Sequence, residues 1–186
     1  SKAELQVKTQ DGFEEYRAAG NVAAGAIHTL EFSMPAEQAT LTALRLEIHP
    51  ETPATASHTP EWGAVFRRIQ LHLLEPGKEP RDIALAEVIG DEAHPLIDPN
   101  DSLREGETGW GAFTKISHAR HAVILPQSPL KLPAGSRLRL TLAHTSRSAG
   151  GSFPLISRRG RVAGSDHEVW TQLLHDAERQ GLKQEI

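Results

Sequence analysis

The chain has 186 residues, a formal net charge of −4 and no cysteine, and its lysines and arginines form no basic stripe. These features exclude disulfides, thiolate nucleophiles and cysteine zinc sites, and they argue against nucleic-acid binding. No apolar run approaches the length of a membrane-spanning helix, so we expect no membrane insertion. Aromatic residues make up 5% of the chain, so the core must come from Leu, Val, Ile and Ala.

Strands are predicted through the first half of the chain. Ile27–Phe32 carries β-type residues, and Thr40–His49 alternates apolar and polar residues in the way of a half-buried strand. After a loop rich in Thr, Pro, Ala and Ser (Glu51–Pro60), a second alternation follows over Val65–Leu74. Asp82–Ile89 is the next predicted strand.

The second half begins with a polar segment, Asp91–Gly109, which is predicted to be a loop. Three further strands are expected at His121–Leu125, Ser136–His144 and Phe153–Ser157. Many short strands bounded by Pro and Gly turns favour an antiparallel sandwich or barrel.

The end of the chain has a helical pattern. Ser165 and Glu168 have the spacing of a capping box, with Ser165 as the N-cap, and Val169 and Leu173 lie on one helical face. Trp170 on this helix is expected to pack onto the sandwich. The sequence therefore predicts a β-sandwich domain over residues 1–163 and a C-terminal helix or linker over residues 164–186.

The expected fold is all-β: an antiparallel sandwich of jelly-roll type, similar to galactose-binding domains, with about eight strands and a C-terminal α-helix. The predicted core residues are Leu44, Leu46, Ile69, Leu71, Leu73, Val123, Leu138, Leu140 and Leu142.

Four motifs resemble a domain of large multidomain proteins from planctomycete bacteria, which also carry cytochrome-c-like segments. The motifs are Leu41–Glu47 (LTALRLE), Trp62–Phe66 (WGAVF), Thr108–Trp110 (TGW) and Pro133–Leu138 (PAGSRL), in the same order as in that family. The resemblance covers roughly residues 25–158, which is most of the chain. The chain departs from the family at Glu61–Gly63, where the family tends to have Gly-Asn.

The resemblance implies an intervening domain similar to galactose-binding-like jelly rolls, inside a larger exported protein in the periplasm or cell envelope. It implies no covalent haem here, because the chain has no cysteine and so no C-x-x-C-H motif. The segment Asp101–Trp110 is also similar to the D-G-…-T-x-W pattern of discoidin-type domains.

Two tryptophans are the leading candidates for ligand contact. Trp110 either offers its indole face to a sugar or plugs one end of the core, and Trp62, predicted in a loop, has the same two interpretations. Asn100, Asp101 and Arg120 are predicted to form hydrogen bonds with the same ligand.

Carboxylates in the polar segment are weighed as a calcium site against a solvated acidic loop. Their spacing matches no known calcium loop, so no metal site is predicted. His118 and His121 are three residues apart at the start of a strand, so they face opposite sides and do not favour a shared metal. The acidic residues are Asp91, Glu92, Asp98, Asp101, Glu105 and Glu107.

A cationic cluster near the end of the chain consists of Arg147, Arg158, Arg159 and Arg161. It is interpreted as a solvated strand edge that discourages strand-to-strand association. Contact with an anionic sugar or with a neighbouring domain is the alternative.

The motifs of nucleophilic, zinc-dependent and phosphate-binding enzymes are missing, so a non-catalytic protein is expected and a hydrolase is the least favoured alternative. The first hypothesis is a binding module, with carbohydrate as the expected ligand. The second is a structural spacer or docking domain that contacts neighbouring domains of a parent chain.

Overall fold

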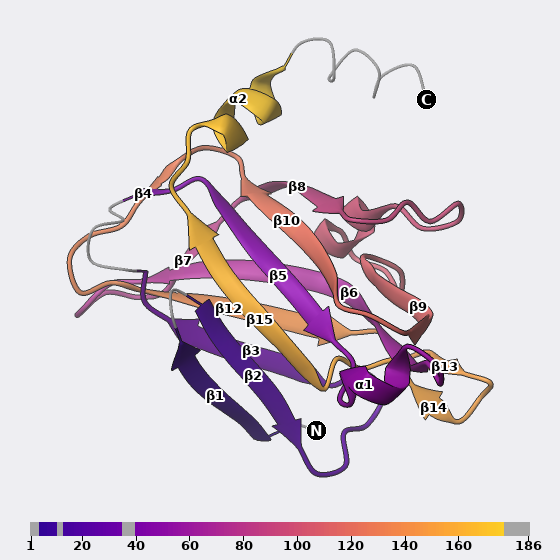
Figure 1. The fold of residues 1–186 in the computed structure, drawn as a ribbon. Helices are drawn as coiled ribbons and strands as arrows, with labels where there is room; N and C mark the ends of the chain where they lie inside the picture. The colour runs from indigo at the N-terminus through magenta and orange to yellow at the C-terminus, as the bar shows by residue number, and fades with distance from the viewer. Residues whose placement is uncertain (1–3, 11–12, 35–39, 177–186) are drawn as a thin grey trace.

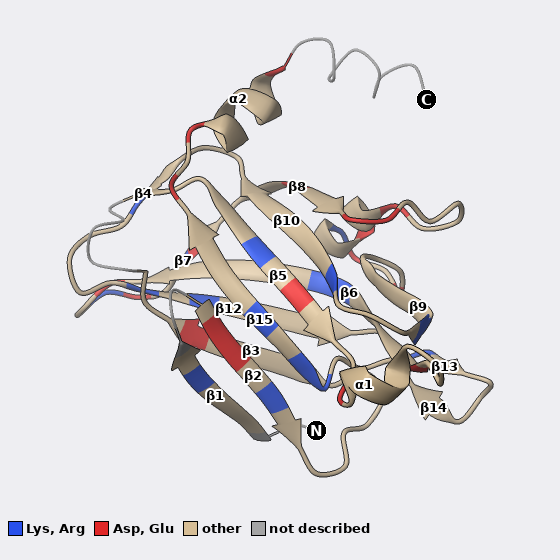
Figure 2. Cartoon of the chain, in the orientation of Figure 1, with Lys and Arg blue, Asp and Glu red and all other residues tan. Residues whose placement is uncertain are grey.

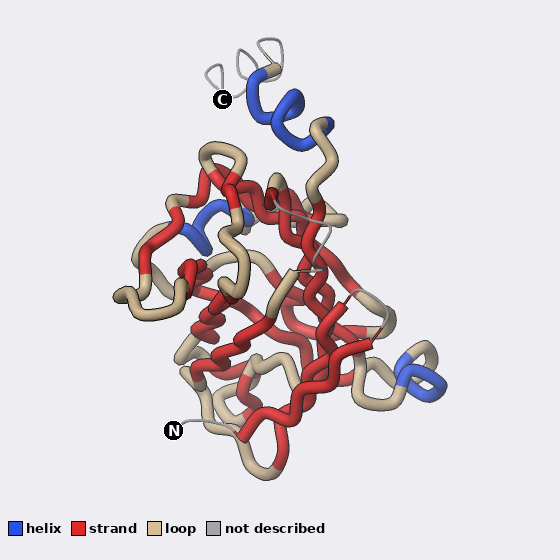
Figure 3. Tube along the Cα trace, turned by 90° about the vertical axis from the view of Figure 1, so that its left-hand side faces the viewer, coloured by secondary structure: helices blue, strands red, loops and turns tan. Residues whose placement is uncertain are grey.

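The computed structural model describes residues 4–10, 13–34 and 40–176, which form two β-sheets packed face to face (Figures 1 and 3). All strand pairs are antiparallel. The first sheet has the order β1 (Glu4–Gln10), β2 (Phe13–Ala19), β15 (Arg159–Ser165), β5 (Ala43–His49), β10 (Arg120–Pro126) and β8 (Leu85–Gly90).

The second sheet has the order β3 (Ile27–Phe32), β12 (Arg137–His144), β6 (Glu61–Leu74) and β7 (Arg81–Ile83), with β9 (Gly111–Ile116) on the first half of β6. From β2 onward the longer strands alternate between the two sheets along the chain. The short elements are β4 (Thr40–Leu41), β11 (Leu130–Lys131), β13 (Ser148–Ala149), β14 (Phe153–Pro154), α1 (Pro53–Ala56), a 3-10 helix (Pro99–Leu103) and α2 (Val169–His175). The prediction of an antiparallel β-sandwich with a C-terminal helix is confirmed.

The core lies between the sheets and contains eight of the nine predicted residues. Val123 is the exception, and its predicted core position is wrong, because Ala122 and Ile124 are the residues of β10 that point inward. Val123 instead pairs with Arg45 and Ile89 and is half-buried on the outer side of the sheet.

Several predicted strands have different bounds in the structure. The strand expected at Asp82–Ile89 divides into β7 and β8, because its first part pairs with β6 and its second part with β10 in the opposite sheet. Thr40–His49 is interrupted at Thr42, whose hydroxyl donates to the carbonyls of Ser165 and His167. The strand predicted over Phe153–Ser157 is limited to β14.

The C-terminal helix begins three residues later than the capping box predicts. Ser165 is the last residue of β15, and its hydroxyl accepts hydrogen bonds from the backbone N–H of His167 and from the Trp170 indole. Glu168 is the N-cap of α2 and makes no side-chain capping bond.

In both views α2 projects from the end of the sandwich (Figures 1 and 3), and none of its residues is buried. Residues 177–186, the rest of the segment predicted as helix or linker, lie outside the described residues. Within the described part of the chain, no helix has the length and apolar character needed to cross a membrane.

Candidate functional site

Trp110 lies in the core and is 2% exposed. Its indole stacks on Phe66 with ring centroids 5.7 Å apart. Its backbone N–H donates to the hydroxyl of Ser102 (2.7 Å), which in turn donates to the carbonyl of Phe66 (2.7 Å). The interpretation of Trp110 as a core plug is therefore confirmed. A sugar-stacking surface needs an exposed ring face, which Trp110 does not offer.

The glycines around Trp110 allow β9 and β6 to approach closely. A Cβ on Gly109 would lie 2.2 Å from the carbonyl oxygen of Phe66, and a Cβ on Gly111 would lie 2.0 Å from that of Ala64. Gly109 also has a φ of +151°, a backbone conformation that residues other than glycine rarely adopt. The two glycines of the TGWG motif therefore allow its backbone to pack directly against the backbone of β6.

Trp62 belongs to β6, so its predicted loop position is wrong. Its side chain is 37% exposed and stacks on Phe153, with ring centroids 4.3 Å apart and an angle of 17° between the ring planes. The ammonium nitrogen of Lys115, its cross-strand partner on β9, lies 3.2 Å from the centroid of the indole. Phe153 remains 46% exposed although one of its faces covers Trp62.

A hollow of about 430 Å³ lies beside this aromatic pair. Its floor is formed by buried residues, which include Ile48, Ala64 and Ile116 from three strands and Ser157 from the segment before β15. Its polar rim consists of His49, Glu51, Glu61, Lys115 and Arg158. The segments that line it come from β5, the loop before β6, β6, β9, β14 and the segment between β14 and β15, so widely separated parts of the sequence build one depression.

The carboxylates of the rim have different partners. Glu61 accepts hydrogen bonds from the backbone N–H groups of Glu51 (2.7 Å) and Thr52 (2.8 Å), so it holds the loop before α1 in place. Glu51 itself lies 3.8 Å from the guanidinium of Arg158, which also donates to the carbonyl of Gly20. The Glu51–Arg158 pair is partly exposed and therefore loosely held.

Asn100, Asp101 and Arg120 do not line this hollow. Asn100 accepts a hydrogen bond from the backbone N–H of Val88 (2.9 Å), and Asp101 accepts one from the hydroxyl of Thr108 (2.9 Å). These bonds attach the 3-10 helix and the following loop to the sandwich. Of the five predicted ligand contacts, Trp62 alone lies at the hollow.

Arg120 is held by two acids that follow β8. Its guanidinium lies 2.9 Å from Asp91 and 3.1 Å from Glu92, and its side chain is 11% exposed. Burial of Asp91 raises its pKa, but the hydrogen bonds from Arg120 and from the backbone N–H of His121 outweigh this and lower it below its usual value. Asp91 therefore stays charged at neutral pH, and all three nitrogens of the Arg120 guanidinium already face a carboxylate.

The acidic residues weighed as calcium ligands do not converge. Glu92 pairs with His118, Asp98 accepts the backbone N–H of Asn100 at the start of the 3-10 helix, and Glu107 binds the N–H and hydroxyl of Ser146. No group of three or more His, Asp or Glu side chains suited to a metal ion occurs among the residues that the structure describes.

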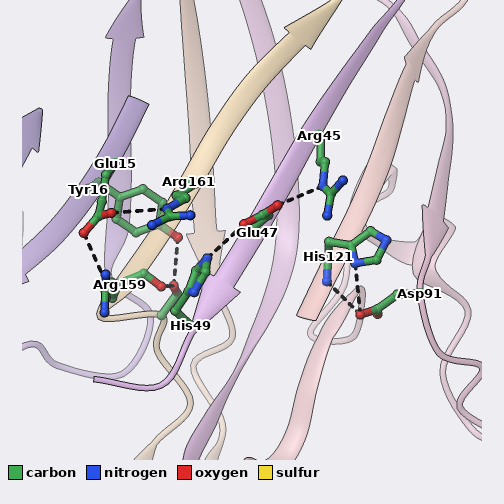
Figure 4. Close-up of polar contacts among 10 residues, drawn as sticks. Glu15, Tyr16, Arg45, Glu47, His49, Asp91, His121, Arg159 and Arg161 are labelled. Carbon is green, nitrogen blue, oxygen red and sulfur yellow. Dashed lines mark hydrogen bonds and ion pairs between the residues drawn. The ribbon is translucent and has the colours of Figure 1, made fainter. Parts of the chain in front are cut away.

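A charged ladder crosses the outer face of the first sheet (Figure 4). Arg159 and Arg161 on β15 donate to opposite oxygens of Glu15 on β2, at 3.1 and 3.2 Å. Burial raises the pKa of Glu15, but the two arginines outweigh it and lower that pKa. The interpretation of these arginines as a solvated edge is wrong, because β15 lies between β2 and β5 inside the sheet.

Beneath the hollow lies a chain of buried polar groups. The hydroxyl of Ser157 is hydrogen-bonded to the phenol of Tyr16 (2.8 Å), while its backbone N–H donates to Nε2 of His144 (3.1 Å). Nδ1 of His144 then donates to the carbonyl of Ala26 (2.8 Å). Both imidazole nitrogens are occupied by backbone groups, so His144 is not oriented to take a proton from Ser157.

No protein family, no curated protein and no solved structure matches this chain. The resemblance carried by the four sequence motifs therefore stays a prediction.

Sequence reasoning missed three other residues around Trp62, namely His49, Lys115 and Phe153, whereas Arg158 was named in the cationic cluster with an anionic sugar as one possible contact. Phe153 had the clearest signal, because it follows the Gly150-Gly151 turn in a chain with few aromatic residues. A large aromatic side chain placed by a glycine turn is exposed more often than one inside an alternating strand.

Proposed function

We propose that this protein is a non-catalytic binding module and that the hollow beside Trp62 and Phe153 binds carbohydrate. The observation that carries the proposal is the pair of stacked, partly exposed aromatic rings at the side of a hollow of about 430 Å³. The volume falls within the usual range of ligand pockets. The two rings are in contact, so their exposed faces form one continuous apolar surface, and such surfaces often mark binding sites.

The mixed character of the hollow suits a sugar ring, which has an apolar C–H face and polar edges. Phe153 offers the ring face that is not covered by Trp62, and Trp62 supports it from behind. Burial lowers the pKa of His49 despite the opposing effect of Glu47, so its imidazole is neutral at pH 7. With Nε2 donating to Glu47 (3.0 Å), Nδ1 is left as an acceptor for a sugar hydroxyl.

The topology supports assigning this module to the jelly-roll class, with galactose-binding-like domains as the relevant comparison. The strands β2, β15, β5 and β10 are neighbours in one sheet, and β3, β12 and β6 are neighbours in the other. This order follows when an antiparallel ribbon winds around a barrel as two Greek keys. The motif resemblance supports placement in a larger exported protein.

Affinity electrophoresis against a panel of neutral and charged polysaccharides tests the proposal. We expect at least one polysaccharide to retard the protein, and Trp62→Ala and Phe153→Ala to abolish the retardation. Phe113→Ala is the matched control, because Phe113 is 51% exposed but does not line the hollow. Retardation that survives the double variant, or no retardation by any polysaccharide, would contradict the proposal.

A docking role is the second candidate, and it is favoured by α2. This helix has no buried residue, and Val169 is 45% exposed at its start. Val169→Cys would introduce a single thiol, because the sequence has no cysteine. Docking against a neighbouring domain would slow its alkylation in a longer parent chain, whereas Ser128→Cys in an exposed turn would react at an unchanged rate.

A further inference from the structure

The hollow beside Phe153 continues along the surface into two further depressions. The second, of about 190 Å³, shares Glu51 and Arg158 with the first and adds Arg17 and Arg159. The third, of about 300 Å³, shares Gln6 and Arg17 with the second and adds Lys8 and Glu15. The three together form one track from β14, across the ends of β15 and β2, to β1.

The track is cationic although the chain as a whole has a net charge of −4. It is lined by five lysines and arginines, which are Lys8, Arg17, Lys115, Arg158 and Arg159, against three glutamates. Figure 2 shows the basic positions on β1, β2 and β15 that follow one another across this end of the sheet.

The glutamates leave part of the positive charge of the track unpaired. Glu15 is shared between Arg159 and Arg161, and Glu61 is occupied by two backbone N–H groups. Arg17 is exposed and makes no ion pair with any residue that the structure describes. Arg158 lies 3.8 Å from Glu51 and donates one N–H to the carbonyl of Gly20, which leaves its other N–H groups unpaired. Two guanidinium groups are therefore available to an incoming anion.

We infer that the ligand is an acidic polysaccharide, one that carries carboxylate or sulfate groups along its chain. This inference rests on the proposed function. A sugar ring lies against Phe153, and acidic groups of the following sugars meet Arg158 and then Arg17. A guanidinium binds a carboxylate or a sulfate through two parallel N–H groups, which gives direction as well as attraction.

The experiment compares polysaccharides that differ in charge but share a backbone. Polygalacturonate is compared with its methyl ester, and dextran sulfate with dextran, by affinity electrophoresis and by titration at low and high salt. We expect the charged member of at least one pair to bind at least about tenfold more tightly, and binding to weaken in high salt. The two pairs distinguish carboxylate from sulfate recognition.

Charge-matched variants locate the recognition. Arg17→Gln and Arg158→Gln should each weaken binding by about tenfold, the loss expected for a hydrogen bond to a charged group. Arg81→Gln removes the same charge from an exposed strand position on β7, outside the track, and should leave binding unchanged.

The outcomes separate this inference from the proposed function. Equal binding of charged and uncharged members, still abolished by Trp62→Ala, would overturn the inference and leave the binding module intact. No binding to any polysaccharide would overturn both. If Arg81→Gln costs as much as Arg17→Gln, or if a single-stranded oligonucleotide binds as tightly as the acidic glycan, the attraction is unspecific and the inference fails.

Discussion

Two buried histidines should make the sandwich sensitive to mild acid. His28 on β3 and His144 on β12 are both 0% exposed, and their ring centroids lie 4.4 Å apart. Burial lowers the pKa of His28 to about 4. Burial, with a smaller contribution from His28, lowers the pKa of His144 to about 3, although the carbonyl of Ala26 acts in the opposite direction. Both rings are therefore neutral in the folded protein at pH 7.

The direction of the pH dependence follows from these values. An unfolded histidine has a pKa near 6.5, so as the pH falls the unfolded chain binds protons before the folded one does. The stabilisation is complete above pH 6.5 and is lost progressively toward pH 4 for His28 and pH 3 for His144. Between pH 7.5 and pH 5.0 each histidine should cost about 2 kcal/mol, or about 4 kcal/mol together. This is a large part of the stability of an ordinary domain.

Urea unfolding at pH 7.5 and pH 5.0 measures the effect. His28→Leu should reduce the loss by about 2 kcal/mol, and His49, whose pKa burial also lowers, contributes to the part that remains. The substitution sacrifices no hydrogen bond, because neither ring nitrogen of His28 has a partner among the described residues. His58→Gln changes an exposed histidine and should leave the loss unchanged. Lowered carboxylate pKa values, as at Glu15 and Asp91, act at lower pH and do not obscure this window. A wild-type free energy of unfolding that is equal at both pH values would refute the reasoning.

Two further predictions concern the TGWG motif. Trp110→Ala should lower the free energy of unfolding by about 3–5 kcal/mol, since it empties a fully packed core position, and chemical denaturation would measure it. Gly109→Ala should also be strongly destabilising, because the new Cβ would meet the Phe66 carbonyl at 2.2 Å. Gly20→Ala is its control: Gly20 also has a positive φ, but no atom lies within 4 Å of the added Cβ, so only the backbone strain is expected. Equal losses at the two glycines would contradict the steric explanation.

The strands that could be predicted are those whose inward residues are large and apolar. β12 alternates leucine with polar residues and was located to within one residue. β15 has Gly160, Val162 and Gly164 at its inward positions, so its hydrophobic pattern is weak. The glycines are there because Tyr16 and Met34 already fill the space that their side chains would need. A periodic pattern reveals a strand only when its inward residues are apolar and large. In β15 the inward glycines leave room for large side chains of neighbouring segments, so the pattern is weak.

The candidate site was harder to predict because exposure depends on contacts between distant segments. Trp62 and Trp110 both lie next to glycine, and nothing in their immediate sequence separates them. Trp110 is buried because β9 brings it against Phe66, while Trp62 is left at the surface between Lys115 and Phe153. The hydrogen-bonding residues near Trp110 in the sequence therefore belong to loop anchoring and not to the hollow.

The position of β15 has a consequence for how the chain must fold. Val162 pairs with Glu14 on one side and with Leu46 on the other, so a strand near the end of the chain joins two segments from its beginning. Until β15 arrives, the β1–β2 hairpin is not attached to the rest of its sheet, and β2 and β5 both present open edges. Closing loops of this length is slow, and open edges favour association with other chains. During synthesis this domain therefore stays prone to aggregation until β15 has emerged. A shortened product that lacks β15 would be a target for chaperones and proteases.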